Sequence, residues 1–188
     1  MMIVIQKAIR SFLSPNPLSS YDKFAHAVAN SLAMNSLSGP VFELKGGELE
    51  ISVDAETLVG LTGNAEIIVD ERNVEPWAAY LAKKKIYVKT GNVAYVSIRG
   101  LHSVPRRKQP VRPGESYRFE NLNGVDERDL RALRVPISLR LPNGDWLESV
   151  ARIQRHLGLV LEAARKGAEQ VKIRVSGGEF EAWVLELA

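Results

Sequence analysis

The chain has 188 residues, of which 45% are hydrophobic and 25% are charged, values that are typical of globular proteins. This length allows one well-packed domain, or one domain with a small appendage. Cysteine is absent, which excludes disulfides, thiolate metal sites and a cysteine nucleophile. The net charge is only +3, and acidic residues alternate with basic ones along most of the chain, so the composition indicates surface ion pairs rather than a nucleic-acid interface.

Targeting and membrane segments are not expected. The apolar opening at Met1 is too short for a signal-peptide core, and no later stretch approaches the roughly 18 to 20 apolar residues of a membrane span. We therefore expect a soluble, cytoplasmic protein.

The N-terminal part predicts one strand and one helix. Residues 2–6 are mostly β-branched and indicate a strand, and the prolines of segment 14–17 break the chain. Ser19 or Ser20 is then a suitable N-cap for a helix over residues 21–34. Apolar residues recur at every fourth position of this helix, at Phe24, Val28 and Leu32.

The central part predicts a succession of short strands. They are expected at residues 41–44, 49–53, 58–61, 67–69, 85–89 and 93–98. The pair Gly46-Gly47 is expected to close the first strand, and the turn 90–92 is expected to join the last two strands into a hairpin. Strands at this spacing favour a compact β-barrel or sandwich over alternating βαβ units.

The C-terminal part predicts a strand, a helix and a β-hairpin. After a strand near residues 117–119 and a short charged helix or turn at 126–133, we expect a strand at 137–141. Asp145 is a suitable N-cap for the strongest helix of the chain, and Gly167 is placed to end it. Strands at 171–175 and 180–187 follow, around the turn 176–178. A boundary near residues 134–136 gives two expected parts, 1–136 and 137–188.

Common catalytic and cofactor motifs are missing. The sequence has no GxxxxGK[ST] loop, no GxGxxG fingerprint and no GxSxG elbow, so no cofactor is expected from a recognisable motif. His26, His102 and His156 lack the spacing of zinc ligands, so no metal site is expected. His26 and His156 are expected at the surface or the edge of the core, whereas His102 follows a strand end, where side chains often line a cleft.

A basic segment runs from Arg106 through Arg107 and Lys108 to Arg118. It is interpreted either as a phosphate-binding surface or as a solvated, proline-extended loop. Because aromatic residues do not alternate with the basic ones, as a platform for single strands would require, nucleic-acid binding is disfavoured. A non-enzymatic regulatory or nucleic-acid-binding module remains the alternative function.

Several fragments, in order, resemble the allophanate hydrolase subunit 2 family, which also includes the C-type subunit of 5-oxoprolinase and is described as biotin-dependent carboxyltransferase-like. The fragments are Tyr21-Asp22-Lys23-Phe24, the run 41–50, Leu61-Thr62-Gly63-Asn64, Val74-Glu75-Pro76-Trp77, Val88-Lys89-Thr90-Gly91-Asn92, Ala94 to Gly100 and Arg112-Pro113-Gly114-Glu115. The chain is similar to a shortened and divergent member. The polar loop expected before the first helix is absent, prolines from Pro105 to Pro110 replace another family loop, and the second half is reduced to about residues 137–188.

The resemblance implies a mainly β (α+β) fold, a cyclophilin-like β-barrel with a few helices and a C-terminal strand, helix and hairpin. It also implies a subunit of an ATP-dependent amide or lactam hydrolase complex that acts on allophanate, urea or 5-oxoproline beside a subunit 1-type partner, with ATP bound only through the complex. The divergence implies that the fold and partner binding can persist without full activity. The candidate substrate-binding residues are Glu43, Thr62, Gly63, Trp77, Arg99 and His102, and catalytic residues are not identified. For three of them a structural role is the alternative to substrate binding: Gly63 can form a turn, Trp77 can pack in the core and Glu43 can form a salt bridge.

Overall fold

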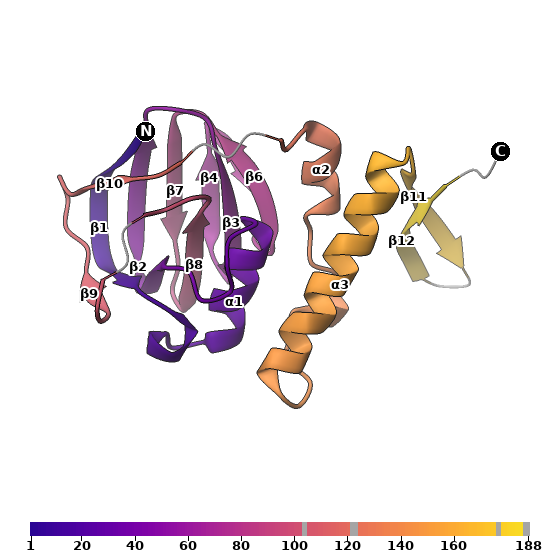
Figure 1. Ribbon diagram of the computed structural model, residues 1–188, viewed down its shortest axis with the longest axis horizontal. Coiled ribbons are helices and arrows are strands. Elements are labelled where there is room, and N and C mark those ends of the chain that lie inside the picture. Colours follow the sequence, from indigo (N-terminus) through magenta and orange to yellow (C-terminus); the bar gives the residue numbers. More distant parts are fainter. Residues whose placement is uncertain (103–104, 121–123, 176–177, 186–188) are drawn as a thin grey trace.

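The computed structural model describes residues 1–102, 105–120, 124–175 and 178–185. Its main body is a curled half-barrel of β-strands with helices packed on one side, and a separate two-stranded sheet lies at the C-terminal end (Figure 1). This mainly β architecture with few helices confirms the expected fold class.

The half-barrel contains ten strands along residues 2–118. They are β1 (Met2–Ser14), β2 (Val41–Val53), β3 (Thr57–Gly63), β4 (Glu66–Val69), β5 (Arg72–Val74), β6 (Ala78–Ala82), β7 (Lys85–Lys89), β8 (Val93–Ile98), β9 (Gln109–Pro110) and β10 (Ser116–Arg118). The short strands β9 and β10 pair with β1, and the path through the rest is β5-β4-β7-β2-β8-β3-β6.

The long strands β1 and β2 form the spine of the half-barrel. They pair antiparallel from Ile3 opposite Val53 to Ser14 opposite Val41, with irregularities that include a bulge near Arg10. Contrary to expectation, Gly46-Gly47 does not end the strand at residue 44 but lies inside the continuous β2. A bulge lets a long strand bend, so one strand can serve two parts of a curled sheet.

The edge of β2 that faces away from β1 pairs with two different groups of strands. Its second half pairs with β7, which continues to β4 and β5, and its first half pairs with β8, which continues to β3 and β6. The expected hairpin between residues 85–89 and 93–98 is therefore wrong: both strands exist, but each pairs with a different half of β2. A turn signal between two strands predicts a hairpin only if no third strand competes for the same edges.

Helix α1 (Lys23–Leu32) covers the outer face of β3 and β8 (Figure 1). Its N-cap is Asp22, whose side chain accepts a hydrogen bond from the Ala25 amide at 3.0 Å, and not Ser19 or Ser20 as expected. The two serines end and follow the short 3-10 helix η1 (Pro17–Ser19). Gly60 permits the close packing of α1, since a Cβ there would lie 2.1 Å from the Ala29 carbonyl oxygen.

Two hydrophobic layers result from this arrangement. Inside the half-barrel, apolar side chains such as Phe42, Leu44, Leu61 and Val96 form the main core. A second cluster joins α1 to the C-terminal helices, with Val28 and Leu32 packed in the same group as Ile153 and Leu157. The strands near α1 are thus covered on both faces, which explains why residues 41–44 are all buried.

The C-terminal part is α2 (Glu127–Ala132), the 3-10 helix η2 (Ile137–Leu139), α3 (Trp146–Arg165) and the hairpin of β11 (Glu169–Val175) and β12 (Gly178–Val184). Asp145 caps α3 as expected, and Gly167 follows its end with φ +96°. The strand expected at 137–141 is wrong, because Ile137 and Leu141 are exposed and the local backbone is η2. The turn residues 176–177 and the end of the expected strand, 186–187, lie outside the described residues. The division into 1–136 and 137–188 stays a prediction.

Within the part of the chain that the structure describes, none of the helices has both the length and the apolarity needed to cross a membrane.

Candidate functional site

A row of polar side chains lies on the sheet face that α1 covers. The strand register pairs Glu43 of β2 with Tyr95 of β8, and Tyr95 in turn with Thr62 of β3. Directly paired residues point to the same face of a sheet. Glu43, Tyr95 and Thr62 are each at most 1% exposed. The structure therefore brings together two of the predicted site residues, Glu43 and Thr62, with Tyr95 between them.

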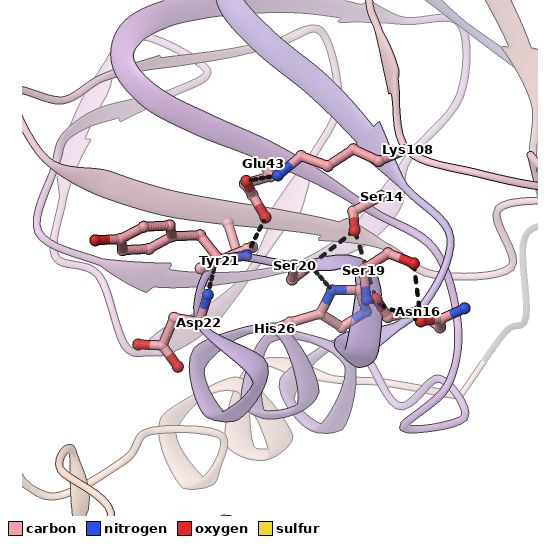
Figure 2. Close-up of polar contacts among 10 residues, drawn as sticks. Ser14, Asn16, Ser19, Ser20, Tyr21, Asp22, His26, Glu43 and Lys108 are labelled. Atoms are coloured by element: carbon pink, nitrogen blue, oxygen red, sulfur yellow. Dashed lines mark hydrogen bonds and ion pairs between the residues drawn. The ribbon is translucent and has the colours of Figure 1, made fainter.

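Glu43 binds two groups with its carboxylate. Figure 2 shows it between the Lys108 ammonium, with which it forms an ion pair, and the backbone at Tyr21, whose amide donates to Glu43 Oε2 at 3.0 Å. Lys108 reaches Glu43 from the segment after β8, with its side chain 28% exposed. A buried charge of this kind is stable only when paired and hydrogen-bonded. The pair fixes the segment at Lys108 and the start of α1 onto β2.

Tyr95 holds the next residue of the same connection. Its hydroxyl accepts a hydrogen bond from the Asp22 amide at 2.7 Å. Burial, followed by the neighbouring Glu43 carboxylate, raises the pKa of Tyr95 far above its ordinary value, so the phenol stays neutral. Consecutive amides at Tyr21 and Asp22 are thus bound by two side chains from the sheet, which sets the position of the α1 N-terminus.

Thr62 fastens the middle of the helix to the sheet. Its hydroxyl donates to the Ala25 carbonyl oxygen at 2.8 Å. One turn further along, Ser97 donates to Asn30 Oδ1 at 2.6 Å, and Asn35 donates to Ser97 Oγ at 3.0 Å. These bonds satisfy polar groups at an interface that excludes water, and they leave Thr62 with a structural role.

His26, on the buried side of α1, forms a short chain of hydrogen bonds with serines (Figure 2). Its Nε2 lies 2.8 Å from the Gly39 carbonyl oxygen, which can only accept, so Nε2 carries the proton. Nδ1 therefore accepts from Ser20 Oγ at 2.6 Å, and Ser20 Oγ lies 2.8 Å from Ser14 Oγ. A serine hydrogen-bonded to an oriented histidine has the contacts of an activated nucleophile.

The protonation of His26 argues against that chemistry. Burial lowers the pKa of His26 to about 4, and the nearby Lys108 also lowers it, while the Gly39 contact and Glu43 act in the opposite direction. A general base works best when its pKa is close to the operating pH. His26 and Ser14 are also fully buried. We therefore interpret the Ser14–Ser20–His26 chain as a clamp that holds the segment before α1, and the expectation that His26 lies at the surface or the edge of the core is wrong.

A small hollow opens on the surface beside this cluster. It has a volume of about 230 Å³ and is lined by Arg10, Tyr21, Lys45, Gly46, Gly91, Asn92 and Val93. The Lys45 ammonium lies 4.6 Å from the centre of the Tyr21 ring, a cation–π contact. Tyr21 connects the hollow to the buried cluster only through its backbone amide, so the hollow does not expose Glu43.

Gly63 and Trp77 have backbone roles. Gly63 ends β3 with φ +97°, and a Cβ there would lie 2.3 Å from the Val93 carbonyl oxygen. Trp77 has φ +66°; its backbone amide donates to the Leu61 carbonyl at 2.6 Å, and its carbonyl accepts from the Val135 amide at 2.8 Å. The centre of its ring lies 6.0 Å from the centre of the Phe24 ring. Both residues match their structural alternatives, a turn and core packing.

Arg99 and His102 lie outside the cluster. Arg99 follows β8, burial lowers its pKa, and its Nε is buried without a hydrogen-bond partner among the described residues. His102 is exposed, and its Nε2 lies 3.0 Å from Glu120 Oε1, which is also exposed. Surface pairs of this kind contribute little to stability. Of the six predicted site residues, the structure thus brings Glu43 and Thr62 into one row, and the substrate-binding role of the six stays a prediction.

Sequence reasoning missed Ser14, Ser20, Tyr95 and Lys108. The sequence groups Lys108 with the basic segment, whereas only Arg106 and Arg107 of that triplet are exposed. No spacing rule joins a lysine to a glutamate 65 positions earlier. Among the described residues, no group of three or more His, Asp or Glu side chains could hold a metal ion.

A family model for the carboxyltransferase domain, subdomains A and B, matches residues 20–133. The match covers more than half of the chain, from just before α1 through the strands β2 to β10 to the end of α2, and it does not include β1. The chain belongs to this carboxyltransferase domain family. No curated protein matches the sequence.

Solved structures share the fold at low sequence identity. Kluyveromyces lactis urea amidolyase superposes with a TM-score of 0.55 and 16% identity, over 76% of this chain and 11% of that one. K. lactis urea carboxylase gives 0.54 and 14%, over 76% and 16%, and TTHA0988 gives 0.54 and 14%, over 66% and 32%. This carboxyltransferase-like chain therefore spans about a third or less of the structures that it matches.

Proposed function

We propose that this chain is a carboxyltransferase-like component of an ATP-dependent complex that hydrolyses a small amide or lactam such as allophanate, urea or 5-oxoproline. In this role the chain is equivalent to allophanate hydrolase subunit 2, or to the C-type subunit of 5-oxoprolinase. It supplies a folded module that binds a subunit 1-type partner, and the partner supplies most of the chemistry. The need for ATP favours the cytoplasm for such a complex.

One observation carries this proposal. The family match covers α1 and the strands β2 to β10, yet the polar residues on the face that α1 covers are occupied by contacts within the chain. Glu43 is bound by Lys108 and the Tyr21 amide, and Thr62 by the Ala25 carbonyl. Groups that are buried and already paired hold a fold together and are not available to a substrate.

The proportions of the structural neighbours support a partner. The chain corresponds to 16% of K. lactis urea carboxylase and to 11% of K. lactis urea amidolyase, so in those proteins a similar fold works beside much more polypeptide. In our proposal the fold of this chain likewise works beside further polypeptide, which a subunit 1-type partner supplies.

The test is reconstitution with a subunit 1-type protein from the same organism. Co-purification at a fixed ratio and ATP-dependent turnover of allophanate, urea or 5-oxoproline are the expected results, measured as ammonia or glutamate release. Each protein alone is the control and is expected to show no turnover. Absence of both association and turnover would contradict the proposal.

A further inference from the structure

A hollow on the described surface lies between α2, the end of α3 and the C-terminal hairpin. Its volume is about 750 Å³, within the roughly 300 to 1,000 Å³ that is typical of small-molecule sites. The lining residues are Arg128, Arg131, Arg134, Ala164, Gly167, Ala168, Glu169, Gln170 and Trp183. Most of the wall lies beyond residue 133, where the family match ends.

Three arginines give this hollow its charge. Arg128 and Arg131 are three residues apart on α2, so they share one face of the helix, about 4.5 Å apart along its axis. Arg134 follows directly after the helix, and all three side chains are exposed. Within the described ranges, no carboxylate forms an ion pair with any of them. Like charges this close repel one another, and a bound anion would relieve that repulsion.

The position of α2 is fixed by a different arginine. Arg165 of α3 donates from Nε to Asp129 Oδ1 at 2.9 Å and from Nη2 to Asp129 Oδ2 at 2.8 Å. Asp129 is only 3% exposed, and it also forms a capping box with Asp126. This two-point contact anchors the helix that carries Arg128 and Arg131. The guanidinium groups of the hollow are therefore presented from a fixed support.

The opposing charges are too small to cancel the three guanidinium groups. Among the described residues that line the hollow, Glu169 is the one that is acidic. The C-terminus of α3 carries about half a negative charge, and its carbonyls are partly satisfied by the amides of Lys166, Gly167 and Ala168. The balance stays positive by more than one charge. Arginine is suited to this task, because its planar group binds two oxygens of a phosphate at once.

Trp183 supplies the second feature of the wall. It lies on β12 opposite Gln170 of β11, is partly buried, and lines the hollow together with the small residues Ala164, Gly167 and Ala168. An aromatic face beside a cationic groove is the arrangement on which nucleic-acid bases stack. An acidic peptide or inorganic phosphate would use the arginines and leave the ring unused.

We propose that this hollow binds a nucleoside polyphosphate, with the phosphates on Arg128, Arg131 and Arg134 and the base against Trp183. The site is independent of the proposed function, because none of its residues belongs to the Glu43 cluster. Binding here would give the chain a nucleotide site of its own, whether or not a partner subunit is present.

The test is to titrate the full chain, in the presence of EDTA, with ATP, ADP, AMP and tripolyphosphate. Binding is measured by calorimetry and by tryptophan fluorescence. ATP should bind more tightly than AMP, and binding should weaken as salt is raised. Each of Arg128→Ala, Arg131→Ala and Arg134→Ala should weaken ATP binding roughly tenfold or more, as expected for the loss of one charge-assisted hydrogen bond.

Two further variants separate the parts of the proposal. Trp183→Leu should weaken ATP binding but leave tripolyphosphate binding unchanged. Arg152→Ala, an exposed arginine of α3 about 18 Å from Ala164 along the helix axis, is the matched control and should bind ATP as the wild type does. All variants should melt within a few degrees of the wild type.

Three results would overturn the inference. The first is no ATP binding at millimolar concentration by a folded chain. The second is equal loss in the Arg131→Ala and Arg152→Ala variants, which would mean general charge attraction. The third is binding of an acidic peptide such as oligoglutamate with no binding of ATP, which would assign the hollow to a protein partner.

Discussion

Burial of a neutral histidine makes the stability of this protein depend on pH in a defined window. The pKa of His26 is about 4 in the folded chain and 6.5 in the unfolded chain. As pH falls below 6.5 the unfolded chain takes up a proton that the folded chain cannot yet bind. The stabilisation is therefore complete above pH 6.5 and is lost between 6.5 and 4. At about 1.4 kcal/mol per pKa unit, the full loss is about 3 kcal/mol, of which about 2 kcal/mol falls between pH 7.5 and 5.

The informative variant is His26→Gln. The glutamine amide nitrogen can replace Nε2 as donor to the Gly39 carbonyl, but it cannot be protonated in this range. The variant should be less stable than the wild type at pH 7.5, because the contact with Ser20 is changed, yet it should lose about 2 kcal/mol less on acidification to pH 5. Above pH 5 most carboxylates stay charged, so this window isolates the histidines.

The assay is urea unfolding at several pH values between 7.5 and 5, with the free energy of unfolding obtained by linear extrapolation. Burial also lowers the pKa of the partly buried His156, so His156→Gln should be measured beside it. If His26→Gln retained the full slope of the wild type while His156→Gln lost it, the burial argument for His26 would be refuted.

Further stability measurements test other contacts. Lys108→Met should lower the free energy of unfolding by about 3 to 5 kcal/mol, because it leaves the buried Glu43 carboxylate without its ammonium partner. The double variant Lys108→Met with Glu43→Gln should recover most of that loss. Equal losses in the single and the double variant would show that the ion pair is unimportant. Gly60→Ala should destabilise by about 1 to 3 kcal/mol, since the added Cβ meets the α1 backbone. Gly158→Ala is the matched control, because an added Cβ there meets no atom within 4 Å, and it should stabilise α3 by about 1 kcal/mol. Opposite signs for the two glycine variants are the expected result, and the same sign would contradict it. His102→Ala should change stability by less than about 0.5 kcal/mol in thermal or urea unfolding, since its partner is exposed.

Local signals in the sequence predict much of the fold, and they fail where distant segments decide the pairing. Asp145 before an amphipathic run and Gly167 after it correctly place α3, because caps act within a few residues. The turn 90–92 misleads, since the competing partner of both strands, β2, is about forty residues away in the chain. The apolar segment 137–141 has no partner strand among the described residues, so Ile137–Leu139 forms the short 3-10 helix η2 instead of a strand.

The candidate site is predicted only in part for the same reason. Glu43 and Thr62 stand in family-like fragments, and the structure brings them into one row. Their meaning depends on Tyr95 and Lys108, which come from β8 and from the segment after it. Sequence shows that a glutamate is present in a strand, but burial and a paired ammonium are properties of the assembled fold.

We propose that the Glu43 cluster supports the structure of the chain and does not carry out the proposed reaction. The most direct test of this claim is the ATP-dependent turnover of the reconstituted complex with Glu43→Gln, a change that keeps an acceptor for the Tyr21 amide. We predict that the variant assembles with its partner and that kcat stays within about threefold of the wild type, less than about 0.7 kcal/mol in activation free energy. A loss of kcat of about a hundredfold or more, with folding and assembly unchanged, would contradict the claim and make Glu43 a catalytic residue.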